Sequence, residues 1–312
     1  MSVNSGFVER INTKSLHRNA GDTFKRKAIP YAYISPTLLL ILVLMIVPIA
    51  MVIGYSFVDR AVTETPSRFT WLDNYAALFT DGVYVEAIGN TFAFTIVSMV
   101  VHMALGMAFA LILNTKSLSK VTKAIFRVVY ILPWMFTAAI IAVMWKLILN
   151  PSGIVNYFLE AAGLISKKVE WLGSVNTAMF SVMLMNIWCG YPFYLVSLLA
   201  GLQGISEDLY EAATVDGANG IHKFLHITIP QLLPIIVSIA MMDFIWTMQT
   251  FGLVWMTTGG GPLHVTEMIS TYTYKLAFTR YKFPLASASA VILLLFCTCL
   301  SLVYVKIQRA RD

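Results

Sequence analysis

The sequence predicts an all-α membrane protein, built as a polytopic bundle of six transmembrane helices. Of the 312 residues, 58% are hydrophobic and only 12% are charged, whereas soluble globular domains carry about 25% charged residues. A helix needs about 20 apolar residues to cross a bilayer. Runs of that length cover residues 31–57, 88–113, 124–149, 177–202, 229–256 and 284–307.

The first run follows a polar, basic segment, residues 1–30. The run is too long for the core of a cleavable signal peptide, so we expect it to be retained as a span. Later runs contain Pro133, Pro192 and Pro234, which membrane helices tolerate where neighbouring groups satisfy the freed carbonyl. Residues 31–312 are therefore predicted to form one transmembrane domain.

Lysine and arginine residues predict the orientation of the bundle. With the N-terminus in the cytoplasm, most of them flank the spans on the cytoplasmic side, as the positive-inside rule requires. The bias is strongest near the first spans, where residues 1–30 and 116–127 are basic. Both termini are thus expected inside, and residues 203–228 should face the cytoplasm. The same residues explain the net charge of +6 without a nucleic-acid partner.

The motifs of catalysis and metal binding are missing from the sequence. Its 3 cysteines lie in apolar runs, its 5 histidines are scattered, and no serine–histidine or paired-carboxylate constellation falls at one membrane depth. There is no GxxxxGK[ST] phosphate loop. The run Gly259–Gly261 is followed by proline and indicates a helix end and a tight turn. We expect no catalytic residue, metal or cofactor in this chain.

The predicted cytoplasmic segment 203–228 contains residues that typically start and end short helices. Ser206 is a candidate N-cap, and Glu207 and Asp208 follow in the first turn, where negative charge suits the helix dipole. Gly217 is placed to end that helix in a left-handed conformation, and Gly220 permits a second bend. The pattern predicts two short helices meeting at an angle.

The charge of this segment indicates what it contacts. An amphipathic loop resting on lipid is expected to present lysine and arginine on its polar face. Here the polar residues are mainly acidic, with one lysine among them: Glu207, Asp208, Glu211, Asp216 and Lys223. The segment is therefore predicted to dock into a groove on another protein.

Four separated stretches resemble the permease subunits of ABC importers, in the carbohydrate-uptake branch that includes maltose and glycerol-phosphate systems. The stretch Glu211-Ala212-Ala213 with Gly217 resembles the EAA signature. The others are "FRVVYILPWMF" with "MWKLILNPSGIVNY" (126–157), "NIWCGYPFYLVSLLAGLQGISEDLYEAA" (186–213), and "FGLVWMTTGGGP" (251–262) with "YTYKLAF" (272–278). The sequence departs from the family at "YKFPLASA" (281–288), where a glycine is usual near Pro284.

The resemblance implies a type I importer permease of the bacterial inner membrane that moves a carbohydrate or polyol inward by alternating access. It implies a second, unlike permease, two cytoplasmic ATPase subunits that hold ATP and Mg²⁺, and an extracytoplasmic solute-binding protein. Lipid surrounds the bundle. The ATPase-coupling residues it implies are Glu211, Ala212, Ala213, Asp216 and Gly217.

A substrate cavity is implied by two predicted spans. Small or polar residues follow i, i+4, i+7 spacing in each, which places each trio on one helix face. These are Asn186, Gly190 and Phe193 in the fourth span and Asp243, Thr247 and Thr250 in the fifth. In the resembled family these faces line the substrate cavity, where Trp246 or Tyr191 could stack on a sugar ring. Small and hydroxyl residues also serve helix packing in membranes.

Asp243 is the sharpest of these residues, because an ionised carboxylate inside a span costs roughly 3 kcal/mol by insertion scales. No lysine or arginine lies at the middle of another span. Asp243 could be a protonated structural carboxyl, could pair with a base on another chain, or could accept substrate hydroxyls in a wet cavity. His102, alone in an apolar run, is predicted to be a packing residue.

Two other functions compete with the importer. A proton-coupled secondary transporter could use Asp243 as its relay, but it would usually show inverted repeats and gives no reason for the EAA segment. A membrane-embedded enzyme would need a catalytic constellation that the sequence lacks. Nothing in the sequence names the substrate.

Overall fold

The computed structural model describes residues 20–62 and 66–309, and over that part the chain is helical. The strand-like pairing found there is an isolated antiparallel bridge between Val58 and Phe69. Most of the predicted basic segment, residues 1–30, lies outside the described residues. The chain divides into two compact units, one ending at Gly54 and one beginning at Tyr55.

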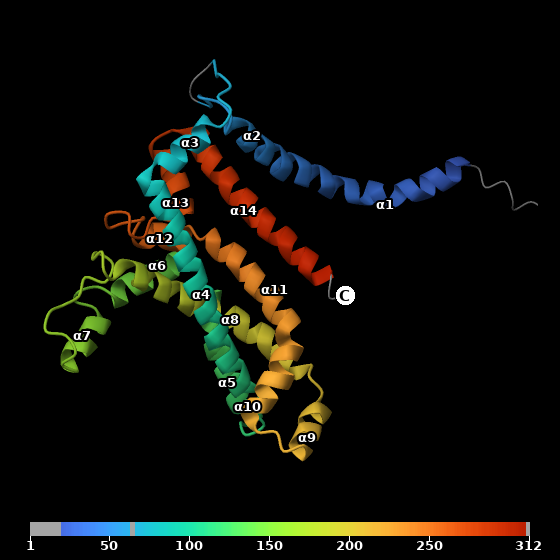
Figure 1. Cartoon of the computed structure of the whole chain (residues 1–312), viewed down its shortest axis with the longest axis vertical. Helices are drawn as coiled ribbons and strands as arrows, with labels where there is room; N and C mark the ends of the chain where they lie inside the picture. The colour runs from blue at the N-terminus through green and yellow to red at the C-terminus, as the bar shows by residue number, and fades with distance from the viewer. Residues whose placement is uncertain (1–19, 63–65, 310–312) are drawn as a thin grey trace, which may run out of the picture. The chain divides into compact units, whose positions relative to one another are not determined.

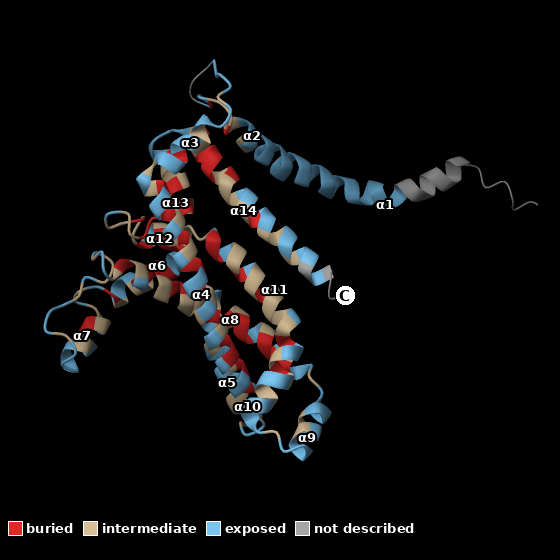
Figure 2. Ribbon diagram, in the orientation of Figure 1, coloured by how far each residue is buried: buried red, intermediate tan, exposed pale blue. Residues whose placement is uncertain are grey.

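The first unit is a continuous helical stretch made of α1 (Ala20–Ile41), a π-helical turn η2 (Leu42–Ile46) and the start of α2 (Val47–Tyr55) (Figure 1). Residues Ile29–Tyr55 are long and apolar enough to cross a membrane, and none of their most apolar window is buried. Figure 2 shows this exposure along α2 and the described part of α1. An apolar helix exposed on all sides is suited to contact with lipid.

The second unit contains the remaining helices. In chain order they are α3 (Asp73–Thr80), α4 (Gly82–Asn114), α5 (Lys120–Ile131), η3 (Leu132–Met135), α6 (Ala138–Ile148), α7 (Ile154–Ala161), α8 (Ala178–Gln203), α9 (Glu207–Val215), α10 (Gly220–Lys223), η4 (Phe224–Thr228), α11 (Ile229–Met248), α12 (Gly252–Thr257), α13 (Ile269–Tyr274), η5 (Lys275–Thr279) and α14 (Phe283–Arg309).

The predicted spans are confirmed, apart from a bend in the third and shifted ends in the fifth. Among the described residues, 5 helices are long and apolar enough to cross a membrane, and a bent pair could supply a sixth. That pair is Lys120–Met135 with Ala138–Ile148, bent by 100° at the predicted third span. The break has a local cause, because Pro133 lies in the tight turn η3 and the Thr137 side chain caps the start of α6.

The fifth span differs from its prediction at both ends. The helix starts at Gly220 and stops at Met248, whereas the sequence pattern gave 229–256. Pro230 has no N–H to donate, and the π-helical turn η4 lies just before it in the helix. Such a turn relieves the missing i→i−4 bond. The second of the two predicted short helices is therefore the first turn of this span.

The centre of the second unit is the packing of α4 on α8, with α11 against both (Figure 1). Gly106 of α4 allows the close approach, because a Cβ there would lie 2.3 Å from the Cβ of Tyr194. Tyr194, Leu195 and Leu198 are fully buried at this contact. A small residue where two membrane helices cross is typical of van der Waals packing between spans.

The glycine run before α13 forms the predicted turn. Gly259 and Gly260 have φ of 59° and 91°, in the left-handed region. Gly260 also leaves room for Glu267, whose carboxylate would lie within 2.9 Å of an added Cβ. Glu267 is fully buried and pairs with Lys275, so this loop is organised around a compensated charge.

The entry to the last span has a left-handed backbone position at a residue that is not glycine. Tyr281 has φ of 56°, a left-handed conformation that glycine adopts without steric cost. The helix α14 then starts at Phe283, with Pro284 in its first turn, where proline is tolerated.

Candidate functional site

The predicted coupling segment begins as the sequence indicates. Ser206 occupies the N-cap position of α9 with extended backbone angles, and Glu207 and Asp208 lie in the first turn. The Ser206 side chain makes no capping bond to the backbone. Its hydroxyl donates instead to the Asp208 carboxylate, at 3.3 Å. The position was predicted correctly, but the expected capping bond is absent.

Gly217 ends α9 as predicted, with φ of 77°. Its N–H donates to the Thr214 carbonyl at 3.1 Å, and the N–H of Ala218 donates to the Ala213 carbonyl at 2.8 Å. These two bonds form a Schellman motif, which requires a left-handed residue at the position of Gly217. Asn219 then caps α10 by accepting a bond from the His222 N–H at 2.8 Å.

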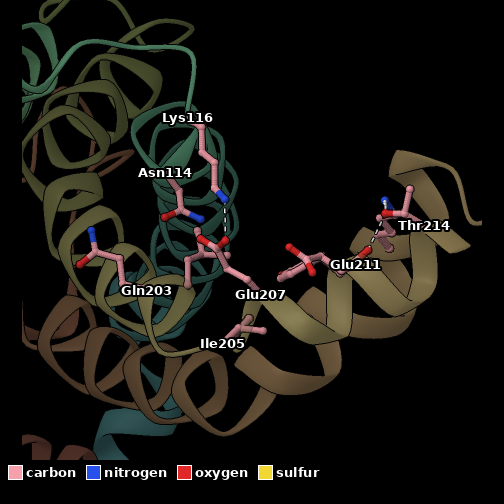
Figure 3. A pocket seen from close by; sticks show the side chains of 10 residues that line it. Asn114, Lys116, Gln203, Ile205, Glu207, Glu211 and Thr214 are labelled. Atoms are coloured by element: carbon pink, nitrogen blue, oxygen red, sulfur yellow. Dashed lines mark hydrogen bonds and ion pairs between the residues drawn. The ribbon is translucent and has the colours of Figure 1, made fainter.

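Two hollows flank the segment and divide the predicted coupling residues between them. The first, of about 410 Å³, is lined by Glu211 together with Asn114, Lys116, Gln203 and Glu207 (Figure 3). The second, of about 400 Å³, is lined by Ala213, Asp216 and Gly217 among others. Ala212 is exposed on the same helix. The segment therefore presents an open surface on two sides.

An ion pair ties the coupling segment to the turn after α4. Lys116 Nζ lies 2.5 Å from Glu207 Oε2 (Figure 3). The hydrogen bond to Glu207 and the charges of Glu207 and Glu211 raise the pKa of Lys116. Within the segment, Lys223 donates to the Thr214 hydroxyl at 2.6 Å, and the Tyr210 and Thr228 hydroxyls are 2.9 Å apart. The segment is thus braced to the spans on either side.

A buried polar cluster lies where α4, α8 and α11 meet. Asp243 of α11 is 7% exposed. Its Oδ2 lies 3.0 Å from His102 Nδ1 and accepts a 3.0 Å bond from the Tyr194 hydroxyl. Its Oδ1 accepts a bond from the Thr247 hydroxyl at 3.0 Å. The sequence suggested no partner for the Asp243 carboxyl, but in the structure His102, Tyr194 and Thr247 of the same chain contact its two oxygens.

His102 is the residue that the sequence did not reveal. It is buried, as expected of a packing residue, and it also links α4 to both other helices: its Nε2 lies 3.0 Å from the Asn186 carbonyl oxygen of α8, and its Nδ1 contacts Asp243 of α11. Gly190 makes this possible, since a Cβ there would lie 2.3 Å from His102 Nε2. Gly190 therefore makes room for a side chain of this chain.

Comparison with known families decides what kind of protein this is. Residues 102–312 match the family described as the binding-protein-dependent transport system inner membrane component. The chain belongs to this permease family. It is accordingly a multi-pass protein of the inner membrane, and the rival interpretation as a proton-coupled secondary transporter is not favoured.

Relatives and a solved structure extend the match over nearly the whole permease. The trehalose/maltose transport system permease protein MalF of Thermococcus litoralis is 32% identical over 293 residues, covering 92% of this chain and 96% of the relative. The sulfoquinovosyl glycerol transport system permease protein SmoG of Agrobacterium fabrum is 31% identical, covering 89% and 90%. A bacterial alginate ABC transporter, solved with an alginate pentasaccharide-bound periplasmic protein, superposes with a TM-score of 0.81 at 23% identity, covering 93% and 97%.

The remaining predicted substrate residues of the permease do not gather at one point. Phe193 and Trp246 pack together with ring centroids 5.3 Å apart, and Trp134 lies 6.2 Å from Phe193. Trp134 and Trp246 are 51% and 53% exposed, and Phe193 is half-buried, so the three residues form an aromatic surface that is open at the two tryptophans. Tyr191 is buried and packs on Phe109.

Thr250 lies outside the helix on which it was expected. The α11 helix ends at Met248, so the predicted i, i+4, i+7 trio keeps only Asp243 and Thr247 on one helical face. The Thr250 carbonyl accepts a 2.6 Å bond from the Ser270 hydroxyl. The sequence marks this ending only weakly, because apolar residues resume after the polar pair Gln249–Thr250 and Gly252.

Asn186 has one feature that its bonded neighbours lack. It is 8% exposed, and its Nδ2 has no hydrogen-bond partner within the described chain. Buried polar groups are nearly always bonded, so an orphan amide donor at a membrane cluster marks a position where a ligand or water could bind.

Proposed function

We propose that this permease is the carbohydrate-translocating subunit of an importer driven by separate ATPases. The unpartnered Asn186 amide, beside the buried cluster, is the observation that carries the proposal. A sugar ring offers hydroxyls to such a donor and an apolar C–H face to an aromatic side chain. The curated names of two relatives, which specify trehalose/maltose and sulfoquinovosyl glycerol transport, support this class.

The open aromatic surface supplies the second half of the recognition. Trp134, Phe193 and Trp246 form a contiguous aromatic surface, while Asp243 and Thr247 are held inside by bonds to this chain. Ligand sites combine apolar and aromatic walls with a few placed polar groups. Direct contacts to a sugar would thus come from Asn186 and Trp246, and Asp243 would support the wall behind them.

The partners follow from the same proposal. The exposed α9 surface, with Glu211 over one hollow and Asp216 and Gly217 over the other, would dock on an ATPase subunit. A second ATPase and a second, unlike permease would complete the channel, and a solute-binding protein would deliver the sugar. The solved alginate complex, which holds a periplasmic protein, supports the last of these.

The test is uptake into proteoliposomes that contain the whole transporter, with saturating solute-binding protein and a panel of sugars. Uptake should require ATP and should be selective for a carbohydrate. Trp246→Ala should lower the rate about two- to thirteenfold, the equivalent of the 0.5–1.5 kcal/mol of an aromatic contact.

The matched control is Met242→Ala, a residue also exposed on α11, and it should change uptake little. Uptake that continues without the ATPase subunits would contradict the proposal. An equal loss in both variants would remove Trp246 from the sugar contacts.

A further inference from the structure

The His102 ring is fixed between two acceptors. Its Nε2 lies 3.0 Å from the Asn186 backbone carbonyl oxygen, and its Nδ1 lies 3.0 Å from Asp243 Oδ2. The side chain is 1% exposed, and the ring fills the space left by Gly190. Both nitrogens are thus held at hydrogen-bond distance by backbone and packing.

These contacts decide where hydrogens must be. A carbonyl oxygen can only accept, so the contact with Asn186 requires a hydrogen on Nε2. A neutral imidazole has one N–H, which leaves Nδ1 bare. An ionised Asp243 oxygen is also only an acceptor. A bare Nδ1 facing a carboxylate at 3.0 Å would be repulsive, so one additional proton must lie on Nδ1 or on Oδ2.

No other contact of Asp243 supplies that proton. Thr247 donates to the other oxygen, Oδ1, and Tyr194 donates to Oδ2 from α8. The titratable groups set against Asp243, besides His102, are Tyr194 and the Cys189 thiol, both on α8. None of the hydrogen bonds or ion pairs recorded for Asp243 in the described chain comes from lysine or arginine.

We propose that His102 and Asp243 jointly retain one proton, and that His102 is the positioning residue of Asp243. The pair is either imidazolium–carboxylate or imidazole–carboxylic acid, and both forms have zero net charge. The proton belongs to the folded structure and is not transported. The role of the carboxyl in the wall of the sugar path rests on the proposed function, whereas proton retention does not.

The charge of the pair has a consequence for the substrate. An uncompensated carboxylate in the wall would repel an anionic sugar and attract cations. A pair with no net charge presents the same carboxyl oxygens without repelling an anionic sugar. Asp243 therefore does not exclude acidic sugars.

Asp243→Asn provides the sharpest test, because an amide can donate to the bare Nδ1. The variant keeps the contact and needs no additional proton. The measurement is the thermal unfolding midpoint of the assembled transporter at several pH values, for wild type and variant. Differences between the two proteins cancel the titration of all other groups.

The sign follows from proton binding. Above about pH 5 the unfolded chains of both proteins bind nearly the same number of protons, because an unfolded aspartate has a pKa of about 3.9. The folded wild type binds one proton more than the variant. Its folding constant should therefore fall tenfold per pH unit relative to the variant for as long as the folded pair keeps that proton.

The expected result is a wild-type midpoint that drops by about 2 °C per pH unit relative to Asp243→Asn, from about pH 5.5 to 8. Parallel curves would overturn the proposal, since they would mean that the folded pair binds no additional proton. A loss of sugar uptake in the variant, with the expected pH dependence intact, would bear on the proposed function alone.

A second measurement covers the case in which Asp243→Asn fails to assemble. In transporter labelled with ¹⁵N-histidine, the His102 signal is the one that disappears in His102→Gln. Its Nε2 should remain protonated through neutral pH. An unprotonated Nε2 would overturn the proposal without reference to any variant of Asp243.

Discussion

The coupling segment (residues 203–228, predicted to dock on an ATPase) and the buried cluster of His102, Tyr194, Asp243 and Thr247 satisfy their polar groups in opposite ways. In the segment the bonds that end the helix are local, because the Gly217 and Ala218 N–H groups bond carbonyls of their own helix. The Lys116–Glu207 ion pair is the exposed contact that ties the segment to the turn after α4. In the cluster, His102 and Asp243 are 141 residues apart and meet only because three helices cross. Local bonds tolerate an exposed, movable element, whereas the long-range ones depend on the packing of the whole core.

The difference suggests a division between stability and coupling. A defect in the cluster leaves polar groups unpaired in a medium that cannot solvate them. A defect in the segment exposes its groups to water, which can replace the lost bonds. The cluster should therefore respond to substitution through folding, and the segment through docking.

The largest effect is expected from Gly190→Val. The new side chain would occupy the position of the His102 ring, which a Cβ already approaches to 2.3 Å. Displacing the ring leaves Asp243 buried without its partner, at a cost of about 3–5 kcal/mol. The measurement is the thermal unfolding midpoint of the assembled transporter.

The matched control for that change is Gly89→Ala on α4, where nothing lies within 4 Å of an added Cβ. It should leave the midpoint unchanged or raise it slightly, because alanine favours a helix over glycine. Equal losses in both variants would mean that glycine content, and not the space for His102, limits stability.

An intermediate effect is expected from Gly217→Ala. A side chain in the left-handed region costs about 1–2 kcal/mol, and the strain falls on the Schellman turn alone. The ATPase subunits should co-purify less well and should be stimulated less by the loaded binding protein. The midpoint of the membrane core should stay within 1 °C or so of wild type.

Gly220→Ala is the control in the same segment, because that glycine has no left-handed φ and its Cβ position is open. Normal co-purification of Gly217→Ala would show that the turn does not set the docking geometry. A large drop in the unfolding midpoint would show that segment and core are not energetically separate.

The smallest effects are expected from substituting the two helix-cap residues of the segment, Asn219 and Ser206, and they distinguish the two caps. Asn219→Ala removes a side chain that accepts the His222 N–H, which should cost about 1 kcal/mol locally. Ser206→Ala should cost much less, because that hydroxyl bonds Asp208 and no backbone group. Amide hydrogen exchange of α9 and α10 measures both, and faster exchange in Ser206→Ala than in Asn219→Ala would contradict the assignment.

Prediction from sequence succeeded where the governing interactions are local. The positions of the spans, the start of α9 at Glu207, the left-handed Gly217 and the turn at Gly259 follow from apolar length and from residue-specific backbone preferences. Each of these depends on a few consecutive residues. The family follows as well, because its signature lies in continuous stretches.

Prediction was incomplete where a helix boundary depends on geometry outside the pattern. The end of α11 at Met248 is followed by the polar pair Gln249–Thr250 and by Gly252, but apolar residues resume beyond them. The predicted span therefore ran on, and Thr250 lies off the predicted face. Likewise, the fifth span extends back to Gly220 because a π-helical turn absorbs Pro230. Apolar periodicity does not report such turns.

By itself, the sequence determined that this chain is a helical membrane permease, and it predicted that the acidic segment 203–228 faces the cytoplasm. Membrane length, charge asymmetry and turn chemistry are properties of neighbouring residues, and they persist in any arrangement of the helices. Only the tertiary structure showed that the carboxyl of Asp243 pairs with His102 and that Gly190 leaves space for the His102 ring. In a bilayer a buried polar group must be paired within the protein, and the crossing of the helices decides which side chain comes within 3.0 Å of Asp243.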